Sequence, residues 1–132
     1  MKYSNKKLSI ENIKVQSIAK KFGTPAYCYS YNQLKENINN FKRSFKSFSP
    51  LICFAVKSNT NVNLISEIRK LGLGADVVSM GELMKALKAG IKPNKIVFSG
   101  VGKTVEEIKY AINKKILLIN AESKSEIFEI ER

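Results

Sequence analysis

Hydrophobic positions in this chain alternate between short continuous runs and longer stretches with a helical repeat. A continuous apolar run that is rich in β-favouring residues predicts a strand buried on both faces of a sheet. Stretches that repeat apolar residues at spacings of three and four predict helices with one buried face. The regular alternation of the two predicts βαβ units and a parallel sheet. The predicted strands cover residues 51–56, 75–78, 96–98 and 116–119.

The predicted helices between these strands carry start and stop signals. Gly72 and Gly90 follow predicted helices, at the position where a glycine commonly ends a helix. A Ser or Thr followed three residues later by Glu matches the capping box, in which each side chain bonds to a backbone N–H of the other residue. This pattern occurs three times, as Ser79-x-x-Glu82, Thr104-x-x-Glu107 and Ser123-x-x-Glu126.

A separate set of elements precedes the first of these strands. We expect a helix over Ile10–Phe22, which Gly23 ends, and then a strand over Ala26–Tyr29. A second helix is expected over Asn32–Phe48, because Pro50 cannot continue it. The buried face of this second helix is expected to consist of its regularly spaced apolar residues, Leu34, Ile38, Phe41, Phe45 and Phe48.

The short and uniform strand–helix units favour a (β/α)8 barrel over a doubly wound sheet. No Gly-x-Gly-x-x-Gly loop follows any predicted strand, which argues against a dinucleotide-binding fold. Four units make half a barrel, since a complete barrel takes about 200–250 residues. The chain also ends inside a predicted helix, at Arg132. We therefore predict an α/β fold, with an N-terminal helix and strand over residues 1–30, the first half of a (β/α)8 barrel over residues 31–132, and the remainder of a longer protein outside this chain.

Composition limits the chemistry that this chain can perform. With 132 residues, 44% of them hydrophobic, the chain is long enough for one domain with a core. It contains no histidine, which excludes Ser-His-Asp and Cys-His catalysis, and two distant cysteines leave no plausible zinc site. Cys28 and Cys53 lie in apolar runs, and the chain shows neither a secretory signal nor a membrane-spanning run. We predict a cytoplasmic protein with reduced thiols, without a metal and without membrane association.

The net charge of +12 raises the alternative of a nucleic-acid-binding protein. Lysines outnumber arginines by 20 to 3, however, and arginine is the usual reader of bases and phosphates. The lysines are spread along every predicted helix, which is typical of solvated helix faces. This distribution disfavours a nucleic-acid partner, and the alternative stays open at this stage.

Lys57 is the first candidate for chemistry, because it directly follows the apolar strand over residues 51–56. In α/β folds, ligands bind at the carboxyl ends of the strands. A lysine held there against apolar walls is partly desolvated, which lowers the pKa of its ammonium group and makes the amine a nucleophile suited to an aldehyde. The alternative is that Lys57 only emerges into solvent after the strand.

Asp76 is the second candidate, because a carboxylate inside a buried strand is costly unless it is paired. The ammonium or iminium group of a nearby Lys57 would be its natural partner. Helix capping alone accounts for Ser79 and Glu82, and a glycine-containing loop with a helix cap accounts for residues 99–104. Further polar residues follow the predicted strands, namely Asn59, Ser99, Asn120 and Glu122.

Five segments together resemble bacterial diaminopimelate decarboxylases, in the order and spacing of that family. Each segment alone is a weak signal, whereas five in register are a strong one, and the resemblance extends from about residue 10 to residue 132. The segments are Phe22–Tyr27 (FGTPAY), Phe54–Asn59 (FAVKSN), Gly74–Leu83 (GADVVSMGEL), Ile96–Lys103 (IVFSGVGK) and Asn120–Ser123 (NAES).

The resemblance implies an enzyme that uses pyridoxal 5′-phosphate (PLP), with an alanine-racemase-like barrel, a second β-domain and a homodimeric assembly. Lys57 would match the lysine that forms a Schiff base with PLP. Asp76 and Glu82 would match acidic positions at the mouth of the barrel, with Asp76 as a cofactor-binding residue. The strand over Ala26–Tyr29 would join the second domain. The reaction implied is decarboxylation of a small amino acid, meso-2,6-diaminoheptanedioate, to L-lysine and carbon dioxide.

Several alternatives remain within and outside this resemblance. Decarboxylases of ornithine, arginine or carboxynorspermidine share the fold, and a non-catalytic PLP carrier consists of a single barrel. The predicted strand over Ala26–Tyr29 argues against the carrier, because a lone barrel has less use for it. Since the family's residues for the cofactor phosphate and ring nitrogen would follow Arg132, we expect this chain alone to be inactive and to aggregate or stay partly unfolded. A relic without function is the last alternative.

Overall fold

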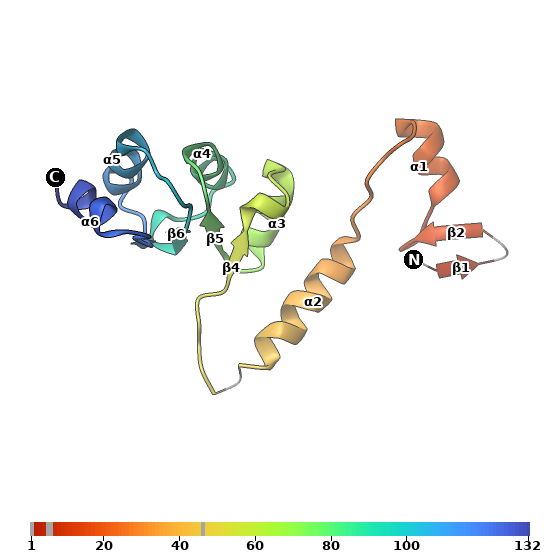
Figure 1. The fold of residues 1–132 in the computed structure, drawn as a ribbon. Helices are drawn as coiled ribbons and strands as arrows, with labels where there is room; N and C mark the ends of the chain where they lie inside the picture. Colours follow the sequence, from red (N-terminus) through yellow and green to blue (C-terminus); the bar gives the residue numbers. More distant parts are fainter. Residues whose placement is uncertain (1, 5–6, 46) are drawn as a thin grey trace. The chain divides into compact units, whose positions relative to one another are not determined.

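The computed structural model describes residues 2–4, 7–45 and 47–132 (Figure 1). The chain divides into two compact units, Met1–Phe48 and Ser49–Arg132. Among the described residues, no helix combines the length and the apolar character that crossing a membrane requires.

The N-terminal unit begins with a small antiparallel sheet of three strands. The strands are β1 (Lys2–Ser4), β2 (Lys7–Ile10) and β3 (Ile13–Lys14), with β2 in the middle. Two helices follow, α1 (Val15–Phe22) and α2 (Tyr31–Arg43).

The prediction of a helix over Ile10–Phe22 is wrong for its first residues, because the helix begins only at Val15. Ile10 instead pairs with Ile13 across a tight turn in which Glu11 has a φ of 53°. Two apolar residues three positions apart can face each other across a tight hairpin, and they can equally lie on one face of a helix. The end of the helix is as predicted, since Gly23 follows it with a φ of 80°.

The predicted strand over Ala26–Tyr29 does not form in this structure, where residues 26–30 belong to neither a helix nor a strand. A strand needs a neighbour whose backbone N–H and C=O groups pair with its own. No such neighbour occurs among the described residues. Tyr27, in the middle of this segment, is 93% exposed.

Helix α2 is shorter than the predicted Asn32–Phe48. Ser30 starts it, because the Ser30 hydroxyl accepts a hydrogen bond of 3.1 Å from the backbone N–H of Gln33. The expected apolar face of α2 is only partly buried, because no described element of the N-terminal unit packs extensively against this helix. Leu34 and Ile38 are half-buried, whereas Phe41, Phe45 and Phe48 are exposed.

The C-terminal unit is built on a parallel sheet of four strands whose order follows the chain. This arrangement confirms the predicted βαβ units and parallel sheet. The first strand is shorter than predicted, because Val56 already belongs to a 3-10 turn. The strands are β4 (Cys53–Ala55), β5 (Gly74–Val77), β6 (Ile96–Phe98) and β7 (Leu118–Ile119).

Four α-helices lie on one face of this sheet and enclose the core with it (Figure 1). The helices are α3 (Val62–Lys70), α4 (Met80–Lys88), α5 (Val105–Asn113) and α6 (Lys124–Glu131), and the 3-10 turns are η1 (Val56–Ser58) and η2 (Pro93–Lys95).

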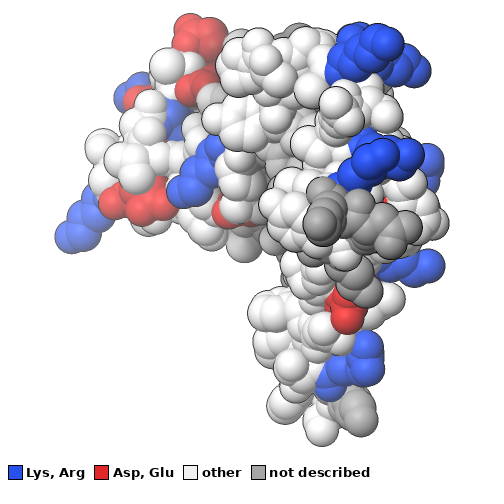
Figure 2. Space-filling model, turned by 90° about the vertical axis from the view of Figure 1, so that its right-hand side faces the viewer, with Lys and Arg blue, Asp and Glu red and all other residues white. Residues whose placement is uncertain are grey.

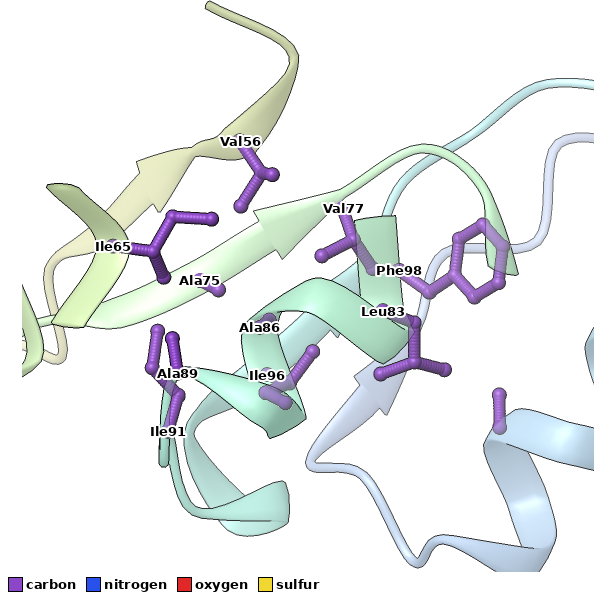
Figure 3. Close-up of a cluster of buried hydrophobic side chains, with 11 residues drawn as sticks. Val56, Ile65, Ala75, Val77, Leu83, Ala86, Ala89, Ile91, Ile96 and Phe98 are labelled. Atoms are coloured by element: carbon purple, nitrogen blue, oxygen red, sulfur yellow. The ribbon is translucent and has the colours of Figure 1, made fainter. Parts of the chain in front are cut away.

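Figure 3 shows the core, in which strand residues meet helix residues from α3 and α4. Ala75 and Val77 of β5 and Phe98 of β6 are fully buried, as are Ile65 of α3 and Leu83 of α4. Full burial of one large apolar side chain stabilises a fold by about 1.5–3 kcal/mol. This packing fixes the direction of the strands, and therefore the position of every residue at their carboxyl ends.

The predicted helix caps are present, with one change in detail. Thr104 and Glu107 form the complete capping box of α5. Ser79 and Ser123 also accept the expected backbone hydrogen bonds, at the starts of α4 and α6. The glutamates of these two helices, however, accept from the N–H one residue before the cap, Val78 for Glu82 and Glu122 for Glu126.

Candidate functional site

The two faces of the parallel sheet differ in what covers them. Phe54, Ala75 and Ile96 are in register on neighbouring strands, and Ala75 and Ile96 are fully buried under the helices. Because side chains alternate along a strand, the next register row points to the other side. That row defines the open face, which α3–α6 leave uncovered, and it consists of Ala55, Asp76, Val97 and Leu118.

Lys57 lies in η1, at the carboxyl end of β4, and the preceding residue Val56 is fully buried in the core. The sequence predicts that Lys57 follows the strand, as it does here. It also predicts that the Lys57 ammonium group is partly removed from water. Lys57 is exposed in this structure. The desolvation expected for this lysine is therefore absent from the described part of the chain.

Asp76 lies in the middle of β5 on the open face, directly opposite Ala55 of β4. Its Oδ1 atom is buried and has no hydrogen-bond partner among the described residues. The expected ion pair with Lys57 does not form here, since Lys57 is exposed. A buried polar atom without a partner costs about 1–3 kcal/mol. The oxygen is thus available for a donor that is not part of this chain.

Cys53 lies on β4, the strand next to that of Asp76. Burial raises the pKa of the Cys53 thiol, and the neighbouring Asp76 carboxylate raises it further. Its sulfur lies 4.0 Å from the carbonyl oxygen of Lys95. The thiol therefore stays protonated near neutral pH, and it is a poor nucleophile.

Glu107 connects the starts of two helices at the carboxyl edge of the sheet. Its Oε1 atom accepts a hydrogen bond of 2.8 Å from the backbone N–H of Met80, and its Oε2 atom accepts one of 3.0 Å from that of Thr104. These backbone hydrogen bonds, with Thr104 the larger contributor, hold the pKa of Glu107 below its usual value. The carboxylate thus joins the loop after β5 to the loop after β6.

A second connection joins the loops that follow β6 and β7. The side-chain amide of Asn120 donates a hydrogen bond of 3.0 Å to the Ser99 hydroxyl. Lys103 binds the backbone oxygen of Asn120 and the carboxylate of Glu126. The hydrogen bond from the Glu122 N–H, followed by that from Lys103, lowers the pKa of Glu126. The sequence indicates Ser99 and Asn120 as polar residues at strand ends and Glu126 as a capping residue, but it does not indicate that Lys103 pairs with Glu126.

Basic side chains are dispersed over the face of the molecule that Figure 2 shows. In Figure 2, Lys and Arg appear as separate groups between uncharged and acidic side chains. This view agrees with the even spread of lysines along the sequence.

Comparison with known proteins identifies the family. The sequence profile of the family described as "Pyridoxal-dependent decarboxylase, pyridoxal binding domain" matches residues 31–132. The chain belongs to this family. It is 44% identical over 127 residues to the diaminopimelate decarboxylase of Aquifex aeolicus, a match that covers 96% of this chain and 30% of the relative. It is 49% identical over 110 residues to that of Helicobacter pylori J99, covering 83% of this chain and 27% of the relative.

Solved structures give the same result. A crystal structure from Aquifex aeolicus superposes with a TM-score of 0.93 and 43% identity, covering 98% of this chain and 32% of that one. The diaminopimelate decarboxylase of M. jannaschii in complex with L-lysine gives a TM-score of 0.94 and 36% identity, covering 98% and 31%. These neighbours confirm the predicted fold class, the N-terminal half of an alanine-racemase-like (β/α)8 barrel. The chain spans about 30% of the length of the relatives it matches.

Proposed function

We propose that this chain is the N-terminal portion of a PLP-dependent diaminopimelate decarboxylase, which converts meso-2,6-diaminoheptanedioate to L-lysine and carbon dioxide. Identities of 44% and 49% to enzymes of that name support the proposal. Three of the similar solved structures are described as complexes with L-lysine, the product of this reaction. The observation that supports the proposal is the position of Lys57 directly after β4 and of Asp76 within the neighbouring strand β5.

The described residues fit PLP in two respects. Lys57 offers a primary amine at the carboxyl edge of the sheet, where an aldehyde can reach it. Asp76 offers a buried carboxylate oxygen without a partner, which a hydrogen-bond donor or a positive charge on a ligand would satisfy. When bound, PLP supplies an aldehyde that condenses with amines and a ring that stabilises the negative charge left as carbon dioxide departs.

The proposed roles of the two side chains follow from their surroundings. Lys57 holds the cofactor between reaction cycles and releases it to the amine of the amino-acid substrate. The second half of a barrel would shield the Lys57 amine from water and enclose the cofactor beside it. Asp76 orients the cofactor from the neighbouring strand and keeps a negative charge beside its positively charged part.

The wider organisation belongs to the same proposal. Residues 1–30 form an N-terminal segment whose part at Ala26–Tyr29 pairs with a C-terminal β-domain, and residues 31–132 form the first half of the PLP-binding barrel. The whole protein is then a cytoplasmic homodimer, and these 132 residues are inactive on their own. The 93% exposure of Tyr27 supports an additional partner for that segment.

Carbon dioxide release by the full-length protein tests the proposed reaction. With PLP present, we expect release from meso-2,6-diaminoheptanedioate with formation of L-lysine, and little release from ornithine or arginine. Lys57→Ala is expected to lower the rate by at least about 10³-fold, because it removes the amine that holds the cofactor. Lys109→Ala, at an exposed position of α5, is the matched control. Faster turnover of ornithine or arginine would overturn the assigned substrate.

A further inference from the structure

One lysine of the C-terminal unit is buried, in contrast to the exposed Lys57. The side chain of Lys103 is only 1% exposed. Its Nζ atom lies 2.7 Å from the backbone oxygen of Asn120 and 3.1 Å from Oε1 of Glu126. The same ammonium group lies 5.6 Å from the centre of the Phe98 ring. The ammonium group of Lys103 is therefore surrounded by a carbonyl oxygen, a carboxylate and an aromatic ring.

A requirement for stability alone does not explain this burial. Moving an ammonium and a carboxylate out of water costs several kcal/mol per ion, and replacing such a pair by apolar residues is often neutral or stabilising. The loop before Lys103 also offers a path to water, since Val101 is 84% exposed and Gly102 has a φ of 69°. The buried ammonium group of Lys103 instead fixes the positions of its two partners, the Asn120 backbone oxygen and the Glu126 carboxylate.

The groups that Lys103 holds are the two ends of the loop between β7 and α6. Asn120 is the first residue of this loop, and its backbone N–H continues the sheet by donating to Phe98 over 2.9 Å. Glu126 lies in the first turn of α6, and its other carboxylate oxygen accepts from the N–H of Glu122 over 2.6 Å. One ammonium group therefore fixes the carboxyl end of β7 and the start of the next helix together.

The Asn120 side chain points toward the open face of the sheet. Asn120 follows Leu118 by two residues, and Ser99 follows Val97 by two, so strand alternation places both on the side of Asp76. The sheet ladder continues at both positions, since the Ser99 N–H donates to the Val77 oxygen over 2.9 Å. The Ser99 hydroxyl and the Asn120 amide, 3.0 Å apart, thus form a polar pair on the cofactor side.

The geometry points to Lys103 as a positioning residue that holds the Ser99–Asn120 pair toward the bound cofactor and substrate. This inference rests on the proposed function, because it assigns the pair to the PLP side of the barrel. The Ser99 hydroxyl can donate a hydrogen bond while its oxygen accepts the one from Asn120, and the Asn120 side-chain oxygen remains available as an acceptor. The pair can therefore recognise one polar group of the ligand through a donor and an acceptor.

Kinetics of four variants of the full-length protein test this inference. Lys103→Met and Ser99→Ala are each expected to lower kcat/KM by about tenfold, because misplaced contacts weaken the oriented state. Both should also shift the absorbance spectrum of bound PLP. The double variant should lose no more than the single ones, since Lys103 acts through the pair. Ile108→Val, a buried apolar change in α5 that removes no hydrogen bond or ion pair, controls for a general loss of stability.

The variants distinguish positioning from a merely structural role. Wild-type kinetics and spectrum in Ser99→Ala would overturn the inference, and this variant leaves the buried ion pair intact if Lys103→Met fails to fold. Losses that multiply in the double variant, or an equal kinetic loss in Ile108→Val, would also overturn it.

A separate readout distinguishes failure of the inference from failure of the proposed function. Wild-type protein that takes up no PLP on Lys57 would contradict the function itself. In that case, amide hydrogen exchange at residues 119–122 still reports on the loop. Lys103→Met should accelerate exchange there while Ile108→Val does not, and unchanged exchange would remove the positioning role.

Discussion

Replacing Gly74 by alanine should destabilise the parallel sheet, whereas the same change at Gly81 should not. Gly74 is the first residue of β5, between two neighbouring strands. A Cβ atom there would collide with the backbone oxygen of Lys95 and would lie 2.9 Å from the sulfur of Cys53. Gly81 lies in α4, where the nearest atom to an added Cβ is the Ser79 hydroxyl oxygen at 3.9 Å.

The expected magnitudes have opposite signs. Overpacking that forces backbone atoms to move costs about 1–3 kcal/mol, and the backbone oxygen of Lys95, at the end of the 3-10 turn η2, cannot rotate away as a flexible side chain can. A glycine inside a helix is less stable than alanine by about 0.5–1 kcal/mol. Gly81→Ala should therefore raise the free energy of unfolding by about 0.5–1 kcal/mol. The two variants should differ by roughly 1.5–4 kcal/mol in the free energy of unfolding.

Thermal unfolding of the full-length protein, followed by circular dichroism, measures this difference. At about 2–4 °C per kcal/mol, Gly74→Ala should melt roughly 3–16 °C below Gly81→Ala, with the wild type between them. A Gly74→Ala protein that melts at or above the wild-type temperature would show that β4, β5 and β6 do not approach as closely as described. Equal losses in both variants would contradict the placement of Gly81 in the first turn of α4, where an added Cβ atom meets no close neighbour.

Two further predictions concern titratable groups. The pKa values of Glu107 and Glu126 are lowered in the folded state, so the stability they contribute is present above their ordinary value of 4.5 and is lost as the pH falls through the depressed values. Glu107→Gln should therefore reduce the slope of melting temperature against pH below about 4.5, and an unchanged slope would exclude Glu107 as a contributor. Cys53 has a raised thiol pKa while Cys28 is exposed, so iodoacetamide should modify Cys28 first at pH 8. Asp76→Asn should lower the pKa of the Cys53 thiol and accelerate its alkylation, and an identical pH profile would show that the two groups do not interact.

In the C-terminal unit, the apolar runs predict the parallel strands, and the capping residues predict where the helices begin. The strand over Ile96–Phe98 has the predicted bounds, because its short apolar run lies between polar residues. The run ending at Val56 predicts too long a strand, since apolar character does not distinguish the last residue of a strand from a buried 3-10 turn. The hairpin at Ile10–Ile13 was missed for a related reason, since its apolar spacing also fits a helix.

The candidate site could be predicted in position but not in its contacts. Lys57 and Asp76 occupy the strand positions that the sequence indicates. Exposure of Lys57 could not be foreseen from its flanking residues, because it depends on what covers the open face. Lys103 was missed because a lysine beside glycines resembles a solvated loop residue, and its partner Glu126 is 23 residues away. The sequence contains one indication of this pair. A glutamate that caps a helix with one carboxylate oxygen, as Glu126 does, has a second oxygen that can bind a lysine.

Reduction of the PLP-loaded full-length protein with borohydride, followed by mass spectrometry of its peptides, tests the central claim most directly. We expect a stable pyridoxyl label on Lys57 alone, and no label on that peptide in Lys57→Ala. Label on another lysine, or label recovered equally from Lys57→Ala, would contradict it.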